Sequence, residues 1–372
     1  MVKKVENKET SKEVEELIYR LNTGSPIELS ILREAFTSVL TQSNSARDVQ
    51  LGSILTGMMV RGPTAEQTEV MLRCAFAIDN FTPHSKEINI PGKSKLVCAV
   101  GSGKKGYKVM NISTPASLIA ASAGAYTAKA VSLATSSATG SGDLLRLLGA
   151  NIDIPVERMI KVTKKVHFGA YPIENTIPKF DKIYGGKFYA PHPLSFGLAA
   201  LASPIKPGVL LYGLAHPNIE LSINVLKKFG VRNAMVVSST DDNVHYLDEL
   251  GVYGTTKLIG MRDGNIGQVL YFNPLRELRL PHYSHKDIAQ GKNVLENVKL
   301  CINILRGRSN KAREDIVCIN AGSILYLAGL ASELPEGFAM AKKVVREGLP
   351  YEKLLEFVEA TGGNKNAIKR YI

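Results

Sequence analysis

Residues 95–124 read KLVCAVGSGKKGYKVMNISTPASLIAASAG. A short apolar run leads into a glycine-rich loop, and the loop leads into a helix for which Thr114 is the expected cap, Pro115 the first residue and Gly124 the stop. A strand, a loop and a helix in this order are typical of α/β folds with a largely parallel sheet. The loop is expected to present backbone N–H groups and a helix N-terminus, which together favour a bound phosphate or another anion.

The same alternation continues towards the C-terminus. Apolar runs at residues 209–212, 234–237 and 268–272 predict further strands that alternate with helices. Residues 161–207 are rich in proline, glycine and aromatic residues, and we expect a long excursion over the site there. We therefore predict an α/β domain with a mainly parallel central sheet over residues 91–372. Ligands of such sheets bind beyond the carboxyl ends of the strands.

The first 90 residues show only helical periodicity. Apolar residues recur at intervals of three and four from Val14 onwards, and Thr64 and Gln67 predict a capping box at the start of a fourth helix. Four helices of this size are too few for a large independent core. We expect residues 1–90 to form a small all-helical domain that packs on the rest of the chain or on a second subunit, and we predict a homodimer.

The composition is that of an ordinary globular protein with an excess of basic residues. The 372 residues include 46 Lys and Arg against 34 Asp and Glu, a formal net charge of +12 that attracts phosphorylated small molecules, nucleic acid or acidic membrane surfaces. No apolar run reaches the ~18 residues of a membrane span, and the charged start lacks the apolar core of a secretory signal. We expect no membrane partner and a cytoplasmic location. Four cysteines without a Cys-x-x-Cys pair are expected to be buried thiols.

Two further segments carry residues suited to a phosphorylated ligand. Residues 129–143 end in SSATGSGD, a run of small hydroxyl residues that leads into a helix and forms a second phosphate-type helix start. Asp248 and Glu249 follow an apolar strand as an adjacent pair of carboxylates. Such a pair suits Mg²⁺, which binds one or two carboxylates together with water and substrate phosphates.

Taken together, these segments resemble the anthranilate phosphoribosyltransferases and their relatives in glycosyltransferase family 3, which also include the pyrimidine nucleoside phosphorylases. The similarity extends from about Glu13 to Gly363. Residues 101–114 match the family's Gly-Thr-Gly-Gly-Asp loop and the Asn-Ile-Ser-Thr that follows it, and residues 129–143 match its Lys-His-Gly-Asn-Arg stretch and its Gly-Ser-Ala-Asp. The resemblance implies the nucleoside phosphorylase/phosphoribosyltransferase type of α/β fold. It also implies an Mg²⁺-dependent enzyme that transfers a phosphoribosyl group from phosphoribosyl pyrophosphate (PRPP) to an aromatic or amine acceptor.

The resemblance also implies which residues form the site. Contacts to PRPP would come from Gly101, Asn111, Ser113, Thr114, Lys129, Ser137 and Ser141, and Mg²⁺ would be held by Ser113, Asp248 and Glu249. Our candidate binding set adds the remaining polar and glycine residues of the two loops, namely Ser102, Gly103, Lys104, Lys105 and Ser132. No covalent nucleophile is expected, because positioning and electrostatic stabilisation of the leaving pyrophosphate are sufficient for such a displacement.

The sequence departs from the family pattern in the phosphate loop and on the acceptor side. Lys104 and Lys105 stand where the family has a glycine and an aspartate, and Ala-Val-Ser-Leu at residues 130–133 replaces His-Gly-Asn-Arg. The Tyr-Ala-Pro-His-Pro segment at residues 189–193 is followed by no arginine up to Lys206, although an arginine would be needed to pair with the carboxylate of anthranilate. We therefore expect an acceptor other than anthranilate.

Two other functions compete with this interpretation. One is a non-catalytic relative whose basic cleft holds a nucleic-acid backbone, with the aromatic residues of segment 161–191 as stacking platforms. The other is a nucleoside phosphorylase that uses inorganic phosphate. The pair Asp248 and Glu249 favours a metal-dependent enzyme, because two carboxylates facing a bound polyanion would only weaken its binding.

Overall fold

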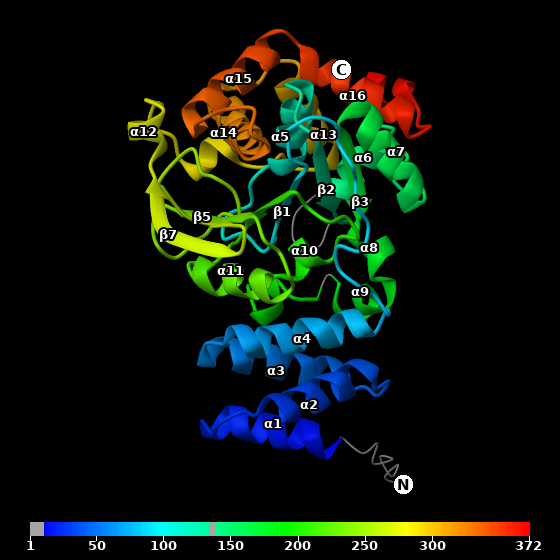
Figure 1. The fold of residues 1–372 in the computed structure, drawn as a ribbon, viewed down its shortest axis with the longest axis vertical. Coiled ribbons are helices and arrows are strands. Elements are labelled where there is room, and N and C mark those ends of the chain that lie inside the picture. Colours follow the sequence, from blue (N-terminus) through cyan, green and yellow to red (C-terminus); the bar gives the residue numbers. More distant parts are fainter. Residues whose placement is uncertain (1–10, 134–138, 186) are drawn as a thin grey trace.

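The computed structural model describes residues 11–133, 139–185 and 187–372. Four helices come first, α1 (Lys12–Thr23), α2 (Leu29–Thr41), α3 (Arg47–Arg61) and α4 (Ala65–Ala77). They are stacked at one end of the molecule (Figure 1). The predicted capping box starts α4, where Gln67 N donates to Thr64 Oγ1 at 3.2 Å and Thr64 N donates to Gln67 Oε1 at 3.0 Å.

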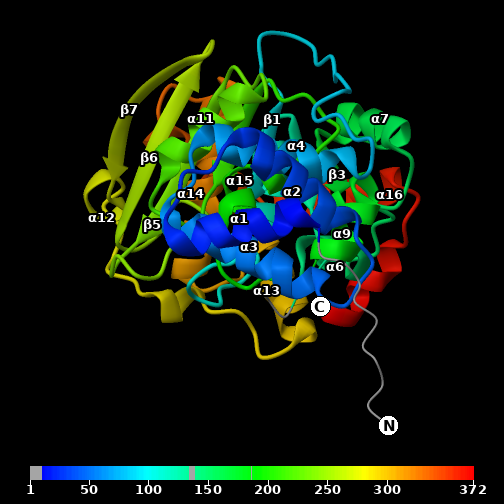
Figure 2. The same ribbon diagram turned by 90° about the horizontal axis from the view of Figure 1, so that it is seen from below.

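A seven-stranded sheet forms the centre of the rest of the chain. Its strands are β1 (Val97–Gly101), β2 (Thr127–Val131), β3 (Phe168–Pro172), β4 (Val209–Gly213), β5 (Ala234–Thr240), β6 (Thr255–Arg262) and β7 (Asn265–Phe272). They are arranged in the order β3-β2-β1-β4-β5-β6-β7. The first five in this order are parallel, whereas β6 and β7 pair in an antiparallel manner at one edge (Figure 2). The predicted fold class, a helical N-terminal region followed by an α/β unit with a mainly parallel sheet, is confirmed.

Helices cover both faces of the sheet. One face carries α5 (Ser113–Ser122), α6 (Ser141–Leu147), α7 (Val156–Val166), α13 (Val294–Leu305), α14 (Lys311–Ala328), α15 (Leu334–Arg346) and α16 (Leu349–Ala360) (Figure 1). The other face carries α11 (Ile219–Lys228), which packs on β5 and β6 and also on α4, so that the N-terminal helices rest on the sheet unit. Among the described residues, no helix is both long and apolar enough to cross a membrane.

The segment predicted as a long excursion contains regular structure. The end of α7 and all of β3 lie within it, followed by α8 (Ile173–Thr176), α9 (Pro178–Tyr184), η1 (Pro193–Phe196) and α10 (Leu198–Leu201). β3 showed no alternating pattern because all five of its residues are buried. The remaining short elements are α12 (Pro274–Glu277), η2 (His285–Ile288) and η3 (Lys365–Tyr371).

Both helix starts expected at the site begin differently from the prediction. α5 starts at Ser113 with Ile112 as the N-cap residue, so Thr114 lies inside the first turn, and its buried hydroxyl has no hydrogen-bond partner among the described residues. α6 starts at Ser141, and Gly140 is the N-cap residue. The hydroxyl oxygen of Ser141 instead accepts a hydrogen bond from Ser132 N at 3.1 Å. Neither the hydroxyl of Thr114, which was expected to cap α5, nor that of Ser141 is therefore used for capping.

Candidate functional site

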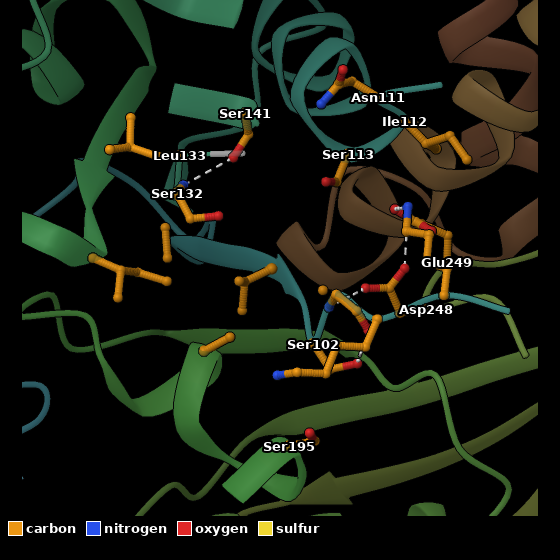
Figure 3. Close-up of a pocket in the computed structure, with 18 of the residues that line it drawn as sticks. Ser102, Asn111, Ile112, Ser113, Ser132, Leu133, Ser141, Ser195, Asp248 and Glu249 are labelled. Carbon is orange, nitrogen blue, oxygen red and sulfur yellow. Dashed lines mark hydrogen bonds and ion pairs between the residues drawn. The ribbon is translucent and has the colours of Figure 1, made fainter. Parts of the chain in front are cut away.

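A cavity of about 220 Å³ lies at the carboxyl ends of the parallel strands. The β1–α5 loop, the β2–α6 loop, the segment around α8 and α9, and residues 248–249 form its walls. Figure 3 shows Ser102 and Asp248 on one side of this space and Ser132 and Ser141 across from them. The parallel topology brings these loops together, because the carboxyl ends of neighbouring parallel strands meet at one edge of the sheet.

The two carboxylates at this edge hold a lysine. Lys105 Nζ lies 2.8 Å from Glu249 Oε1 and 3.2 Å from Asp248 Oδ1. Asp248 and Glu249 are both nearly fully buried. Burial by itself would lower the pKa of Lys105, but the two carboxylates raise it above its ordinary value. Burial and the charge of Asp248 raise the pKa of Glu249 to about 8.

Close packing against two strand ends fixes Asp248. Gly103 N donates to Asp248 Oδ2 at 2.7 Å. A Cβ atom at Gly101, the last residue of β1, would overlap Asp248 Oδ2, and one at Gly213, the last residue of β4, would overlap the backbone of Asp248. Both strands must end in glycine for the carboxylate to approach so closely.

The glycine-rich loop uses much of its backbone internally. The N–H groups of Ser102, Gly103 and Gly106 donate to Gly213 O, Asp248 Oδ2 and Tyr246 O, respectively. The sequence predicted a backbone cradle for phosphate, and these three N–H groups are not available for it. The positive charge that this loop brings to the cavity comes from lysine side chains.

Lys104 lines the cavity beside an aromatic cluster. Its Nζ donates to Tyr184 Oη at 2.6 Å, and Tyr184 Oη lies 2.7 Å from His192 Nε2. The ring of Tyr184 is stacked between those of Phe180 and Phe188. Burial lowers the pKa of Lys104 to about 8, and burial together with the charge of Lys104 holds the pKa of His192 well below its usual range. The backbone of Lys104 has φ +60°, the left-handed region that favours glycine.

A third lysine reaches the cavity from the middle of a strand. Lys129 on β2 is nearly fully buried, and its Nζ donates to Ala130 O at 3.3 Å. Within the described ranges, Lys129 forms no ion pair within 4.0 Å. Burial lowers its pKa to about 8, and the carboxylates of Glu249 and Asp248 only partly offset this. An ammonium group held in this way gains from an incoming anion.

The structure brings most of the predicted site residues to one cavity. Those that line it are Gly101, Ser102, Gly103, Lys104, Lys105, Asn111, Ser113, Lys129, Ser132, Ser141, Asp248 and Glu249. Thr114 does not line the cavity, because its side chain points into the core from the first turn of α5. Ser137 lies outside the described residues.

Several lining residues were not predicted from the sequence. Glu174 and Asp181, on α8 and α9, bring two further carboxyl groups, and burial raises the pKa of both. Glu174 Oε1 accepts a hydrogen bond from Leu133 N at 2.6 Å. Asn297 of α13 also lines the cavity, within the long stretch over which the sequence resembles the family. No local sequence pattern marked Glu174 and Asp181, because they follow β3, which was itself not predicted.

Comparisons with known proteins show which family and which fold the chain resembles. Residues 93–351 match the family described as glycosyl transferase family, a/b domain. The anthranilate phosphoribosyltransferase of Methanothermobacter thermautotrophicus is 30% identical over 325 residues, which cover 84% of this chain and 89% of that protein. The enzyme of the same name from Helicobacter pylori is 29% identical over 337 residues, 88% of this chain and 93% of that protein.

Solved structures share the fold. Anthranilate phosphoribosyltransferase from Thermus thermophilus aligns with a TM-score of 0.74 at 23% identity, covering 93% of this chain and 99% of that one. The enzyme from Saccharomyces cerevisiae, solved in complex with PRPP and Mg, aligns with a TM-score of 0.73 at 17% identity, covering 95% and 99%. At these identities the likeness shows a common fold.

Proposed function

The chain belongs to the glycosyl transferase family as an anthranilate phosphoribosyltransferase-like protein, and from this premise we propose that it transfers a phosphoribosyl group from PRPP to an amine or aromatic acceptor other than anthranilate. One observation carries the proposal. The ammonium groups of Lys104, Lys105 and Lys129 line one cavity at the carboxyl ends of β1 and β2, beside the start of α5. Ammonium and hydroxyl groups that face one cavity suit a phosphorylated sugar.

The proposed reaction is a displacement at the ribose carbon C1. The bond between C1 and the pyrophosphate oxygen breaks, a bond from C1 to the acceptor nitrogen forms, and the nitrogen loses a proton. Lys104 and Lys129 would stabilise the negative charge that develops on the leaving pyrophosphate, while Ser113 and Asn111 orient the ligand at the start of α5. These residues act by position and charge, and none forms a covalent intermediate.

The cavity wall supports an acceptor without a carboxylate. None of the described residues that line the cavity is an arginine. Glu174 and Asp181 lie in the wall together with the rings of Tyr184 and Phe188. Buried carboxyl groups would repel the carboxylate of anthranilate, whereas the rings suit a flat neutral or cationic amine.

Magnesium was part of the expectation from the sequence, and the yeast relative was solved with PRPP and Mg. Asp248 and Glu249 are the type of oxygen donor that Mg²⁺ prefers. Here, however, Lys105 Nζ contacts both of them, and no group of three or more potential metal-ligating His, Cys, Asp or Glu side chains occurs in the described part of the chain. The residues in this arrangement do not fit a divalent ion between the carboxylates, and we derive no step through one.

The proposal includes a homodimer formed through the N-terminal helices. Tyr19 on α1 and Val49 and Val60 on α3 are large apolar side chains with exposed fractions of 66%, 72% and 83%. Covering them against a second copy would remove apolar surface from water. The boundary near residue 90 and the cytoplasmic location stay predictions from the sequence.

Nucleic-acid binding is less well supported by the geometry. Segment 161–191 offered six aromatic side chains as stacking platforms, but Phe168, Tyr171 and Phe180 are buried and Tyr184 and Phe188 line the cavity. Only Tyr189 of this group is largely exposed. A row of exposed rings, which successive bases would need, is not formed by these residues.

Calorimetric titration with PRPP tests the proposal, followed by an assay of pyrophosphate release with a panel of aromatic amines. We expect the parent protein to bind PRPP, and Lys129→Ala to weaken binding by about tenfold or more, because a buried ammonium is lost from the cavity. Lys164→Ala is the matched control, since it removes an exposed lysine from α7. A parent protein that binds no PRPP in any buffer would contradict the proposed function.

A further inference from the structure

Lys105 is placed where the family resemblance expects a metal. We propose that Lys105 Nζ takes the place of a divalent cation between Asp248 and Glu249, so that this protein binds the diphosphate end of its ligand without a metal. The inference deepens the proposed function and rests on it for the class of ligand. In this arrangement the ammonium group of Lys105 is a permanent cation of the binding site.

The position of the ammonium group is the first observation. Lys105 Nζ contacts one oxygen of each carboxylate, at 2.8 and 3.2 Å, and the side chains of Asp248 and Glu249 are only 2% and 5% exposed. Two adjacent carboxyl groups buried to this extent repel each other strongly when both are ionised, and a cation that contacts both of them relieves this repulsion. Among the described residues, Lys105 is the cation that contacts them.

The loop is shaped to deliver this lysine. Gly103 and Lys104 both have positive φ, +69° and +60°, and this turn sends the side chain of Lys104 to Tyr184 and that of Lys105 to the carboxylates. A Cβ at Gly106 would lie 2.6 Å from the Cβ of His245, so the loop continues in close contact with the segment that precedes Asp248. The contact between Lys105 and the carboxylates is therefore built into the backbone.

The ammonium group also faces the ligand space. Lys105 lines the cavity and its side chain is 21% exposed. An ammonium has three donors, and Lys105 Nζ donates one of them to Glu249 Oε1, whereas its contact with Asp248 Oδ1 is an ion pair without a hydrogen bond. A remaining donor can meet a phosphate oxygen, in the same cavity as Lys104 and Lys129. Four of the described residues that line the cavity are lysines and four are acidic, so the placement of the ammonium groups, rather than a surplus of charge, favours a diphosphate.

A divalent ion would have to compete with this arrangement. To reach both carboxylates it would displace Lys105 Nζ from two close contacts, and the displaced ammonium would then repel the ion at short range. The single positive charge of the Lys105 ammonium is lower than the double charge of Mg²⁺, but it is present at every metal concentration. Ligand binding is accordingly expected to be independent of free metal, since no metal takes part in the equilibrium.

The first experiment titrates the parent protein with inorganic pyrophosphate, once in EDTA and once with excess MgCl₂. We expect dissociation constants that agree within about threefold, after correction for the complex of Mg²⁺ with pyrophosphate in solution. Lys105→Met should weaken binding in EDTA by about tenfold or more. Binding of pyrophosphate by the parent only when Mg²⁺ is present would overturn the inference.

The second experiment measures Mn²⁺ binding directly by electron paramagnetic resonance, without any phosphate ligand. The parent should leave Mn²⁺ free, and Lys105→Met should bind one ion per chain because the carboxylates have lost their cation. The double variant Lys105→Met with Asp248→Asn should lose this ion again. Lys93→Met removes a lysine from the exposed segment before β1 and should behave as the parent does.

Two outcomes would overturn the inference here. The parent and Lys105→Met could bind Mn²⁺ equally, or Lys105→Met could gain no ion. If Lys105→Met fails to fold, Lys105→Gln replaces it, and the pyrophosphate titration of the parent by itself still supports or overturns the inference. If pyrophosphate and PRPP bind to none of the proteins, the proposed function fails, whereas the Mn²⁺ measurement tests the place of Lys105 separately.

Discussion

Two places in the described part of the chain hold a lysine between adjacent carboxylates. At the cavity, Lys105 contacts Asp248 and Glu249, and elsewhere Lys342 on α15 contacts the pair at residues 314–315 on α14. The lysines are similarly covered, with side chains 21% and 19% exposed. In both cases burial opposes the charge of the lysine, and the carboxylates raise its pKa nevertheless. The residue types are the same, and only the surroundings differ.

The surroundings of the two clusters show that the Lys342 cluster is a structural ion pair and that the Lys105 cluster belongs to a binding site. Asp315 also accepts a hydrogen bond from Tyr283 Oη at 2.9 Å, and the cluster lies between two helices packed against each other. Glu249 Oε2 has no hydrogen-bond partner among the described residues, and Lys105 lines a cavity. Unused donors and acceptors beside open space are what a ligand needs. A lysine between two acids therefore indicates function only where it faces such space.

The largest expected effect is a loss of stability in both lysine variants. Added metal should then distinguish the two clusters, because it should restore the stability of only one variant. Lys342→Met and Lys105→Met should each lower the free energy of unfolding in EDTA by about 3 kcal/mol, because each leaves buried carboxylates without a cation. MnCl₂ should restore only Lys105→Met, since its carboxylate pair borders the cavity whereas the other pair lies between two packed helices. Urea denaturation with and without MnCl₂ measures both. Equal recovery of the two variants would remove the distinction between the clusters.

A smaller loss of stability is expected when the backbone next to Asp248 is changed. Gly101→Ala should destabilise the fold by about 2 kcal/mol, because the added Cβ would overlap Asp248 Oδ2 and force the carboxylate to move. It should also weaken pyrophosphate binding. Gly329→Ala, at the left-handed end of α14 with open space around it, provides a control that tests backbone strain alone. Thermal unfolding compares the two, and an unchanged affinity for pyrophosphate in Gly101→Ala would argue against a fixed place for Asp248.

The next effect concerns the ligand and contrasts the two lysines directly. Lys342→Met should leave the dissociation constant for pyrophosphate within about twofold of the parent, whereas Lys105→Met should raise it about tenfold, or ~1.4 kcal/mol. Titration calorimetry of both folded variants in EDTA makes this measurement. A comparable loss in Lys342→Met would mean that general charge, rather than position, governs the affinity.

The smallest effect is a dependence on pH. Burial lowers the pKa of Lys104 and of Lys129 to about 8, so both lose charge as the pH rises through this value, and pyrophosphate affinity should fall a few-fold between about pH 7 and about pH 9. Lys129→Met should show a flatter profile, and Lys342→Met should keep that of the parent. Comparing profiles corrects for the ionisation of pyrophosphate itself. An identical profile in Lys129→Met would contradict a role for this ammonium.

The charge changes of Lys104 and Lys129 affect stability in the direction opposite to their effect on pyrophosphate affinity. The folded pKa of these two lysines lies below the unfolded value of 10.5, so the unfolded chain binds more protons between about pH 8 and 10.5. Their contribution to the free energy of unfolding therefore rises with pH in this window. For Lys105 and Lys342 the folded pKa is raised, so their stabilisation is present below 10.5 and is lost as the pH rises through the folded value. Urea denaturation across this range tests both directions.

Much of the fold followed from local patterns. The apolar runs at residues 209–212 and 234–237 correspond to β4 and β5, and the capping box begins α4 as predicted. β3 was missed because a strand buried on both faces shows no alternation. The run at residues 268–272 was predicted as a strand but belongs to the antiparallel hairpin of β6 and β7, since the direction of pairing depends on partners that the run itself does not specify.

The site could be predicted in its members but not in their contacts. The rule for parallel sheets places loop residues such as Ser102 and Ser141 at the same edge as Asp248, and the structure has them there. That Lys105 lies on the carboxylates was not foreseen, because it is 144 residues from Glu249 in the chain. The turn at Lys104 that directs it has no signature in residue types, since a lysine in the left-handed region is unusual.

That left-handed lysine has an evolutionary consequence. A residue with a side chain costs about 1 kcal/mol more than glycine in this region of backbone space, and the resemblance places a glycine at this position in relatives. Lys104→Gly should accordingly yield a more stable protein with one less cation beside Tyr184. A lineage under selection for stability alone would drift back to glycine, so persistence of lysine here would be a record of selection for what the cavity binds.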